Sequence, residues 1–268
     1  MILNYFNYTH IITLIAAAGL IAAVYFSLRK SSVFAKEIAV LVLMGLNLTQ
    51  HFYKFFLWPH LWGTGFDIIN TAYNVCALLI IASPVVYLSK NSLLRQFVAY
   101  VGTIGPAVTL LVPYWFVGST IFTWEYLRGW TCHTLLLATS LLPVLWGLVK
   151  FNYRDGWKFG FVFLAMLALI LLNDTVFTLA LGQATKETLH DTLVARNPLW
   201  TMGPSGPFES LGRIFEAFTP RIFLDPPVPI LWYAIPMYLM ITIVAYALGG
   251  LLDTSPQSDA VLTLKKIK

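Results

Sequence analysis

The segment Phe159–Leu181 reads FGFVFLAMLALILLNDTVFTLAL, and Asp174 is the single charged residue in it. An α-helix needs about 20 predominantly apolar residues to cross the roughly 30 Å hydrocarbon core of a bilayer. The segment also lacks the alternation of apolar and polar residues that marks a transmembrane β-strand. It therefore predicts a membrane-spanning helix, whose backbone groups bond within the helix because lipid offers them no partner.

Six further segments have similar length and character. Across the chain, apolar residues make up 58% and charged residues 11%, with a mean hydropathy of +0.74. A soluble domain carries roughly 25% charged residues, because its surface meets water. We therefore expect an all-α, polytopic integral membrane protein in which residues 1–268 form one domain. Its seven expected transmembrane helices cover about residues 9–28, 33–56, 68–88, 93–113, 131–149, 159–181 and 229–252.

The lysines and arginines cluster in alternate connections between these segments. Such a bias marks the cytoplasmic side of a membrane, so we expect the N-terminus outside and the C-terminus in the cytoplasm. The net charge of +5 follows from these clusters and does not indicate nucleic-acid binding. Because residues 1–10 contain no Lys or Arg, we expect the first apolar segment to be a span rather than a cleaved signal peptide. The basic residues of the alternate connections are Arg29, Lys30, Lys36, Lys90, Arg95, Lys150, Arg154, Lys158, Lys265, Lys266 and Lys268.

The longest connection, about residues 182–228, is expected outside. Its first part is rich in Pro and Gly and predicts turns. Farther on, apolar residues recur at helical spacing and predict a short amphipathic helix over about 207–218. This helix either lies in the membrane interface or packs as a lid over the helix ends. No internal repeat is evident, which counts against an inverted-repeat transporter.

Polar and ionisable side chains concentrate in the outer halves of four expected spans. Such groups are costly within lipid and are candidates for function, although single Asn or Thr residues more often join neighbouring helices. Their number predicts a polar cavity open to the outer leaflet, whereas the inner halves of these spans are almost purely apolar. The residues are Asn47, Gln50, His51 and Lys54 on one face of the second span, Asn70, Tyr73, Asn74 and Cys76 in the third, Cys132 and His133 in the fifth, and Asn173, Asp174 and Thr175 in the sixth.

A thiol and an imidazole come to similar depths in this set, Cys76 at roughly 12 Å and His133 at roughly 6 Å below the outer ends of their spans. A His can take the proton of a thiol, and the thiolate can attack an ester carbonyl. Asn173 or Asp174 can orient the imidazole or stabilise an oxyanion. This chemistry needs no metal or soluble cofactor, and the two cysteines match neither a disulfide framework nor a zinc site. We expect Cys132 to be a small apolar core residue.

Three segments carry a resemblance to a known family. Residues 70–79 read NTAYNVCALL, residues 131–136 read TCHTLL, and residues 196–212 read RNPLWTMGPSGPFESLG. In this order they resemble the LPLHLCNL, SHGLIVL and NYLFLRRKPAGPSLLDLLG segments of the YwaF-like integral membrane proteins, whose mammalian relative is transmembrane protein 164. The resemblance covers roughly residues 68–218 and agrees with seven spans.

The resemblance implies a fatty acyltransferase that acts on phospholipids or lysophospholipids. Cys76 and His133 fall on the family's Cys and His, as nucleophile and base, and Asn173 falls where the sixth span often has an Asn. A group of androgen-induced membrane hydrolases is distantly similar and has a Thr in place of the Cys, so lipid hydrolysis is a related expectation. The chain departs from the family at Asn74, where the family has His, and at Ala77, where an Asn often stands. A polar insertion also occupies about residues 183–194.

A non-enzymatic transporter or receptor-like protein is the alternative. The same cavity then binds a small polar or lipidic ligand, with His51, Lys54 and Asp174 as charged contacts. A structural subunit of a larger membrane complex also remains open, and the sequence indicates no oligomeric state. In each case we expect a multi-pass protein of a bacterial cytoplasmic membrane that requires no cofactor. The residues expected to line the cavity or bind substrate are Asn47, Gln50, His51, Lys54, Tyr73, Asn74, Asp174 and Asn197.

Overall fold

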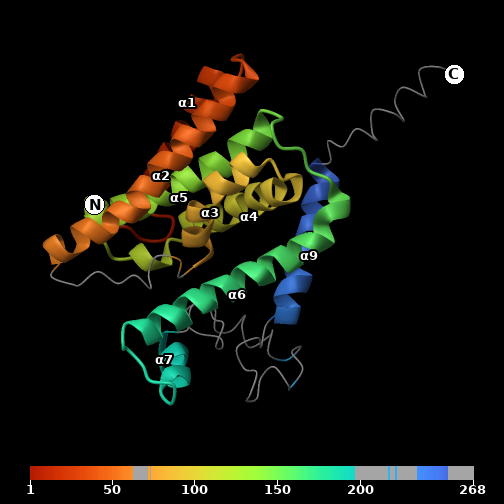
Figure 1. Ribbon diagram of the computed structural model, residues 1–268. Coiled ribbons are helices and arrows are strands. Elements are labelled where there is room, and N and C mark those ends of the chain that lie inside the picture. Colours follow the sequence, from red (N-terminus) through yellow and green to blue (C-terminus); the bar gives the residue numbers. More distant parts are fainter. Residues whose placement is uncertain (63–71, 73, 197–216, 218–220, 222–233, 253–268) are drawn as a thin grey trace.

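The computed structural model describes residues 1–62, 72, 74–196, 217, 221 and 234–252. Within them the chain forms eight α-helices and no strand, apart from an isolated bridge between Ile2 and Thr120 (Figure 1). The all-helical class is therefore confirmed for the described residues. The helices are α1 (Tyr8–Leu28), α2 (Val33–Trp62), α3 (Val75–Ser89), α4 (Ser92–Leu111), α5 (Trp124–Leu145), α6 (Gly156–Ala180), α7 (Leu189–Arg196) and α9 (Ala234–Leu252), with short 3-10 turns η2 (Tyr114–Phe116) and η3 (Tyr153–Asp155).

Four helices are long and apolar enough to cross a membrane. They are α1, the part of α2 from Val33 to Tyr53, α4 and α6. α3 and the segment Tyr238–Ala247 of α9 are apolar but shorter. α5 opens with the residues WEYLRGW, whose polar and charged members lower its hydropathy. Length and composition thus support four of the expected spans within the described chain.

Polar side chains set the first residue of four helices. Asn7, Asn74, Asn91 and Thr123 precede α1, α3, α4 and α5, and each side-chain oxygen accepts a hydrogen bond from the backbone N–H three residues further on. Such N-caps stabilise a helix by about 1 kcal/mol each, because they satisfy an N–H that has no partner within the helix. The helices therefore begin at these caps and not where the apolar segments begin.

Two expected boundaries need correction for this reason. α5 begins at Trp124 rather than at about 131, because Thr123 caps it and the helix continues through polar turns. It ends at Leu145, before Gly147 adopts a φ of +71° that a helix does not contain. α3 begins at Val75 rather than at about 68, directly after its cap.

The long connection is described only in part. α7 (Leu189–Arg196) precedes the Pro and Gly residues that predict turns, and those residues, within 198–207, lie outside the described residues. The expected amphipathic helix over about 207–218 lies, apart from residue 217, outside the described residues.

The pair of α4 and α5 forms the centre of the helix bundle, and α2, α3 and α6 border it (Figure 1). At Gly102 the two helices approach closely, since an added Cβ would lie 2.2 Å from Ser140 Oγ. Buried Phe97, Leu136 and Phe159 belong to the main core cluster around this contact. α9 packs along the first half of α6, beyond the α4–α5 pair.

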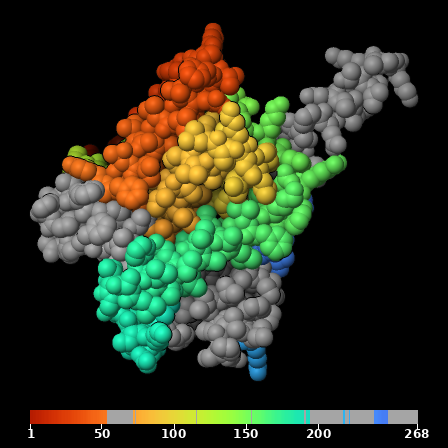
Figure 2. Space-filling model, viewed as in Figure 1, coloured from red at the N-terminus to blue at the C-terminus, as the bar shows by residue number. Residues whose placement is uncertain are grey.

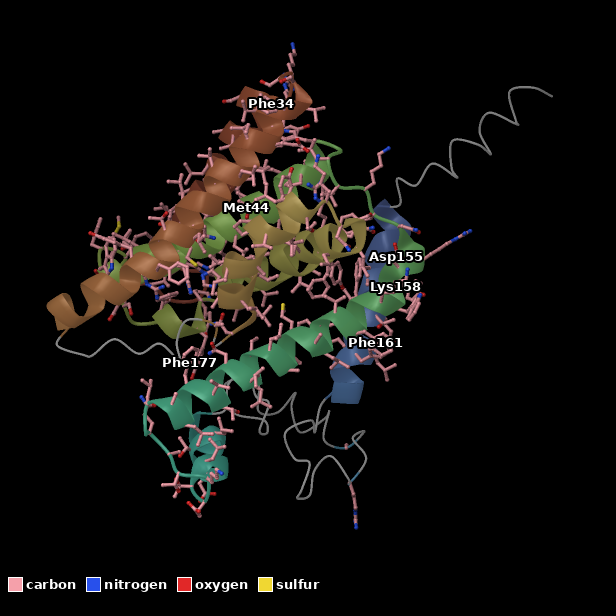
Figure 3. The ribbon with its side chains drawn as sticks, in the orientation of Figure 1. Phe34, Met44, Asp155, Lys158, Phe161 and Phe177 are labelled. Atoms are coloured by element: carbon pink, nitrogen blue, oxygen red, sulfur yellow. The ribbon has the colours of Figure 1, made fainter. Side chains whose placement is uncertain are left out.

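The outward faces of the long helices are apolar. On α2, Phe34 is 72% exposed whereas Met44 is 4% exposed, and Figure 3 labels both. On α6, Phe161 is exposed one turn beyond the ion pair between Lys158 and Asp155 (Figure 3). Figure 2 shows α2 (orange) as a ridge beside α3 and α4 (yellow). Exposed apolar surface on this scale indicates contact with a membrane.

The N-terminal segment is fastened to the connection between α4 and α5. The N–H of Leu3 donates to the carbonyl of Ser119 at 2.8 Å, and the N–H of Gly118 donates to the carbonyl of Leu3 at 2.9 Å. The side chain of Leu3 is fully buried. The first turn of α1 is therefore held beside the end of α4.

The halves of α3 and α5 that are expected to face the cytoplasm are less apolar than predicted. Ser83 on α3 and Thr139 and Ser140 on α5 are all buried there. A few hydroxyl residues change the hydropathy of a segment little, although each hydroxyl is a donor and an acceptor that needs a partner. The expectation that these halves are almost purely apolar therefore needs this correction.

Candidate functional site

Cys76 is the second residue of α3 and lies against α4. Its side chain is partly buried, and a Cβ added at Gly105 would lie 3.8 Å from the Cys76 sulfur. It packs against the main core cluster, which includes Cys132 on α5. Neither cysteine forms a disulfide within the described residues. A Cβ at this distance would make only an ordinary van der Waals contact, so the distance places the thiol of Cys76 directly beside α4 at Gly105.

His133 lies on α5, and its ring orientation follows from one hydrogen bond. Its Nδ1 is 2.7 Å from the carbonyl oxygen of Gly129, one turn earlier. A carbonyl can only accept, so Nδ1 donates and, in the neutral ring, Nε2 presents a lone pair. The ring lines a hollow between α1, α4 and α5 that encloses about 10 Å³, room for one water-sized group, and we term it the His133 hollow. Thr109 of α4 and Trp130 of α5 also line it.

The thiol and the His133 hollow border adjacent turns of α4. The thiol lies at Gly105 and the hollow at Thr109, whose Oγ1 donates to the Gly105 carbonyl at 3.1 Å. These four residues of helix correspond to a rise of about 6 Å. Cys76 itself is not among the residues that line the hollow.

The depths expected for the two groups need correction. Cys76 follows its helix start at Val75 by one residue, and His133 is nine residues beyond Trp124, which corresponds to about 14 Å of helix. Counting residues from the start of an apolar segment therefore does not show how far Cys76 and His133 lie from each other along the bundle axis. The neighbouring helix α4 supplies the better reference, because it borders both groups.

The polar stripe on α2 faces α5. Asn47 Nδ2 donates to the carbonyl of Cys132 at 3.1 Å, and Gln50 Nε2 donates to the carbonyl of Arg128 at 2.8 Å. His51, directly after Gln50 in the stripe, is 3% exposed. The amides of Asn47 and Gln50 therefore join two helices, which is a common structural role of polar residues in membranes.

The other predicted site residues are distributed around α3 and α6. Asn74 Oδ1 accepts from the N–H of Ala77 at 2.8 Å, so its side chain caps α3. On α6, Asp174 is 2% exposed and Asn173 is partly buried. α6 borders α3, the helix that carries Cys76, but supplies no residue to the His133 hollow. Outside the described side chains lie those of Lys54, Tyr73 and Asn197.

His10 is a site residue that the sequence did not single out. It lies in the first turn of α1, is 1% exposed and lines the same hollow as His133. Its Nδ1 accepts from the N–H of Phe6 at 3.0 Å, so its Nε2 donates to the carbonyl of Leu110 at 2.8 Å. The sequence did contain a signal for His10. It is a histidine at the outer edge of the first apolar segment, on the same expected side of the membrane as His133.

The arrangement offers a thiol, an imidazole acceptor and an apolar hollow within a few turns of helix. Among the described residues, no three His, Cys, Asp or Glu side chains come together as a metal site. Phe116, Tyr126 and Trp130 supply aromatic walls to the hollow. The hollow itself admits about one water-sized group, while the thiol and the imidazole suit nucleophilic and proton-transfer steps.

The sequence profile of the TMEM164 family matches residues 5–188, more than half of the chain. The chain belongs to the TMEM164 family. Both Cys76 and His133 lie within the matched range, so the resemblance drawn from their surroundings is confirmed at the level of the family. The segment 196–212, which also resembles the family, lies beyond the match. Neither a curated protein nor a solved structure matches the chain.

Membership of the TMEM164 family and the four long apolar helices agree on the class of the protein. It is an integral membrane protein with transmembrane helices.

Proposed function

We propose that this member of the TMEM164 family is a membrane-embedded acyltransferase that moves fatty acyl chains between phospholipids and lysophospholipids. Cys76 carries the acyl group as a thioester, His133 acts as base, and Asn173 supports the reacting groups. The observation that carries the proposal is the thiol and the imidazole acceptor along adjacent turns of α4, at Gly105 and Thr109.

The proposed reaction has two half-reactions. In the first, the thiol proton of Cys76 passes to Nε2 of His133, and the thiolate attacks the ester carbonyl of a phospholipid. The ester carbon–oxygen bond breaks, and the imidazolium returns the proton to the departing lysophospholipid oxygen. In the second, the hydroxyl of a lysophospholipid acceptor gives its proton to His133 and attacks the thioester. The sulfur leaves as a thiolate and regains that proton.

The hydrogen bond of His133 supports the role of base. Because Nδ1 donates to the carbonyl of Gly129, the neutral ring has its lone pair on Nε2, and the same bond fixes the plane of the ring. A base oriented by a second group is the general arrangement that activates a nucleophile. The aromatic walls of the His133 hollow support an apolar substrate.

The proposal includes seven membrane crossings, with the N-terminus outside and the C-terminus in the cytoplasm. The shorter apolar helix α3, the polar-ended α5 and α9 then join the four long apolar helices as spans. The clusters of Lys and Arg in alternate connections support this orientation. Cys76 and His133 then lie in the outer half of the membrane, and the outer leaflet supplies the acyl donor. Protease access to tags at either terminus of sealed vesicles tests the orientation.

The test of the chemistry is acyl transfer by purified protein in vesicles. The vesicles contain phosphatidylcholine with deuterated acyl chains and lysophosphatidylethanolamine as acceptor. Mass spectrometry then follows the deuterated acyl group on Cys76 and on the acceptor. We expect wild type and Cys132→Ala, the matched thiol control, to form both products and Cys76→Ala to form neither. His133→Gln should slow transfer by about a hundredfold or more, as loss of a general base does.

Other outcomes separate the alternatives. Undiminished transfer by Cys76→Ala would overturn the proposal. Release of free fatty acid that depends on Cys76, without transfer to the acceptor, would make the same residues a lipid hydrolase. A ligand-binding protein without catalysis predicts the opposite pattern of sensitivity, in which Cys76→Ser is tolerated and Lys54→Ala or Asp174→Asn weakens binding.

A further inference from the structure

A second hollow lies at the other end of α3, α4 and α5. It encloses about 10 Å³, which is room for one oxygen-sized group, and we term it the Arg95 hollow. Met44 of α2, which Figure 3 labels, forms one wall, and Tyr87, Arg95 and Ser140 come from α3, α4 and α5. Tyr87 is eleven residues beyond Cys76, which corresponds to about 16 Å along α3. The Arg95 hollow is therefore separate from the proposed acyl-transfer site.

Buried polar groups in and beside the hollow have unused hydrogen-bonding capacity. Tyr87 is 5% exposed and Ser140 is 1% exposed, and neither hydroxyl has a hydrogen-bond partner among the described residues. The indole N–H of Trp146, which packs against Met44 and Tyr87, likewise has no partner there. Buried polar groups are almost always hydrogen-bonded to protein, water or a ligand. Two such hydroxyls line the hollow, with the indole outside its wall, and they indicate a group that completes their bonds.

Arg95 brings a positive charge to the same hollow. Its Nε donates to the carbonyl of Tyr87 at 2.9 Å, its Nη2 donates to the same oxygen, and its guanidinium carbon is 4.4 Å from the centre of the Tyr87 ring. These contacts use one edge of the guanidinium and fix its plane. The remaining N–H groups can only donate, so the group that fits them is an acceptor with negative charge.

We infer that the Arg95 hollow binds the phosphate group of an anionic phospholipid. A phosphoryl oxygen accepts from the hydroxyls of Tyr87 and Ser140, and a second oxygen faces the guanidinium of Arg95. A lipid suits the place better than a free anion, because Val86, Val98 and Pro143 add apolar wall. The other two hydroxyls of the wall, those of Ser83 and Thr139, already donate to carbonyls of their own helices. Basic pockets between transmembrane helices are a recurring type of lipid headgroup site.

The experiment measures lipid affinity of the full chain in a neutral detergent, by titration with phosphatidylglycerol and by native mass spectrometry of the retained lipid. Phosphatidylcholine and inorganic phosphate are the comparison ligands. We expect phosphatidylglycerol to bind most tightly and Arg95→Gln to weaken it by about tenfold or more, since charge-assisted bonds are lost. Lys150→Gln is the matched control, because it removes an exposed positive charge next to Val149 of the same hollow.

A second variant covers the case in which Arg95→Gln fails to fold. The double variant Tyr87→Phe and Ser140→Ala keeps Arg95 and its bonds to the carbonyl of Tyr87. It should lower the affinity for phosphatidylglycerol and leave the affinity for the comparison ligands unchanged. Equal weakening by Lys150→Gln would show attraction to surface charge in general and overturn the inference. Equal affinity for phosphatidylcholine or for inorganic phosphate would do the same. None of these results depends on acyl transfer at Cys76.

Discussion

The His133 hollow and the Arg95 hollow lie at opposite ends of α4 and α5 and differ in what their polar groups offer. In the His133 hollow, both ring nitrogens of His10 are bonded, Thr13 Oγ1 donates to the carbonyl of His10, and Trp130 Nε1 donates to the carbonyl of Thr13. The bond from His133 Nδ1 leaves Nε2 of that ring to act as an acceptor. In the Arg95 hollow, the groups that can still donate hydrogen bonds are the hydroxyls of Tyr87 and Ser140 and the guanidinium of Arg95.

This difference shows that the number of polar residues does not identify a ligand site in a membrane. The expected outer halves are rich in Asn, Gln and His, yet the amide nitrogens of Asn47 and Gln50 donate to backbone carbonyls of α5, and only the Asn47 oxygen of these two amides is buried without a partner among the described residues. The opposite halves contain few polar residues, yet Tyr87 and Ser140 are buried without a partner among the described residues. What matters is which groups remain to be satisfied after the helices have packed.

The largest expected effect on stability comes from disrupting the close contact between α4 and α5 at Gly102, which lies between the two hollows. Gly102→Leu puts a side chain where Ser140 Oγ lies 2.2 Å from an ideal Cβ, so α4 and α5 must separate. Overpacking of this kind costs about 3 kcal/mol or more, and we expect most of the protein to unfold or aggregate in detergent. Thermal unfolding and size-exclusion chromatography measure this.

Gly45→Leu on α2 is the control for Gly102→Leu, because nothing lies within 4 Å of an added Cβ there. Ser140→Ala should partly rescue Gly102→Ala, since it removes the nearest atom but leaves the Ser140 Cβ at 3.1 Å. If Gly102→Leu were as stable as the Gly45→Leu control, the close packing of α4 against α5 at Gly102 would not contribute to stability as predicted.

The next largest effect on stability is expected at the His133 hollow. His10→Phe removes the bond to the Leu110 carbonyl and the acceptor for the Phe6 N–H, at a φ of +52° for Phe6. Two lost bonds cost about 1–3 kcal/mol of unfolding free energy. Hydrogen exchange should become faster at the amides of Phe6 and Gly118, where the N-terminal segment is fastened. Tyr8→Phe, an exposed residue in the same turn, should leave both rates unchanged.

A smaller effect is expected at the bond between α5 and α1. Trp130→Phe keeps an aromatic wall of the His133 hollow and removes the donor to the Thr13 carbonyl, which is 3.1 Å away. Interhelical hydrogen bonds in membranes average about 0.6 kcal/mol, so the unfolding midpoint should fall by only a few degrees. Trp157→Phe, on the exposed face of α6, is the control. An equal change in both variants would attribute the effect to loss of indole area instead of the bond.

The sequence predicts the helices well where one physical signal decides them. The apolar run of Phe159–Leu181 is long enough to decide α6, and the observed helix, Gly156–Ala180, differs from it by a few residues. α5 differs more, because hydropathy reports lipid exposure whereas a helix ends where its caps lie. Thr123 extends α5 through Glu125 and Arg128, which no hydropathy threshold would include.

The sequence predicts the candidate site less completely, because it does not say which helices are neighbours. Spacing alone indicates that Asn47, Gln50 and His51 share a face. That Asn47 and Gln50 bond carbonyls of α5 follows only from the packing of the two helices. His10 belongs to the site only because the end of α4 supplies the Leu110 carbonyl. Tyr87 and Ser140 are ordinary members of apolar segments until α3 and α5 bring them to one hollow.

The smallest expected effect is at the Arg95 hollow, and it tests the comparison most directly. Tyr87→Phe removes a hydroxyl that has no partner among the described residues, so no bond within them is lost. Replacing an unsatisfied buried group by an apolar one is close to neutral or stabilising, and we expect a change within about 0.5 kcal/mol in lipid-free detergent. With phosphatidylglycerol present, wild type should gain thermal stability that Tyr87→Phe does not, because only bound ligand gives the hydroxyl a partner. A clear loss of stability without lipid would mean that the hydroxyl is already bonded, and the two hollows would then not differ as described.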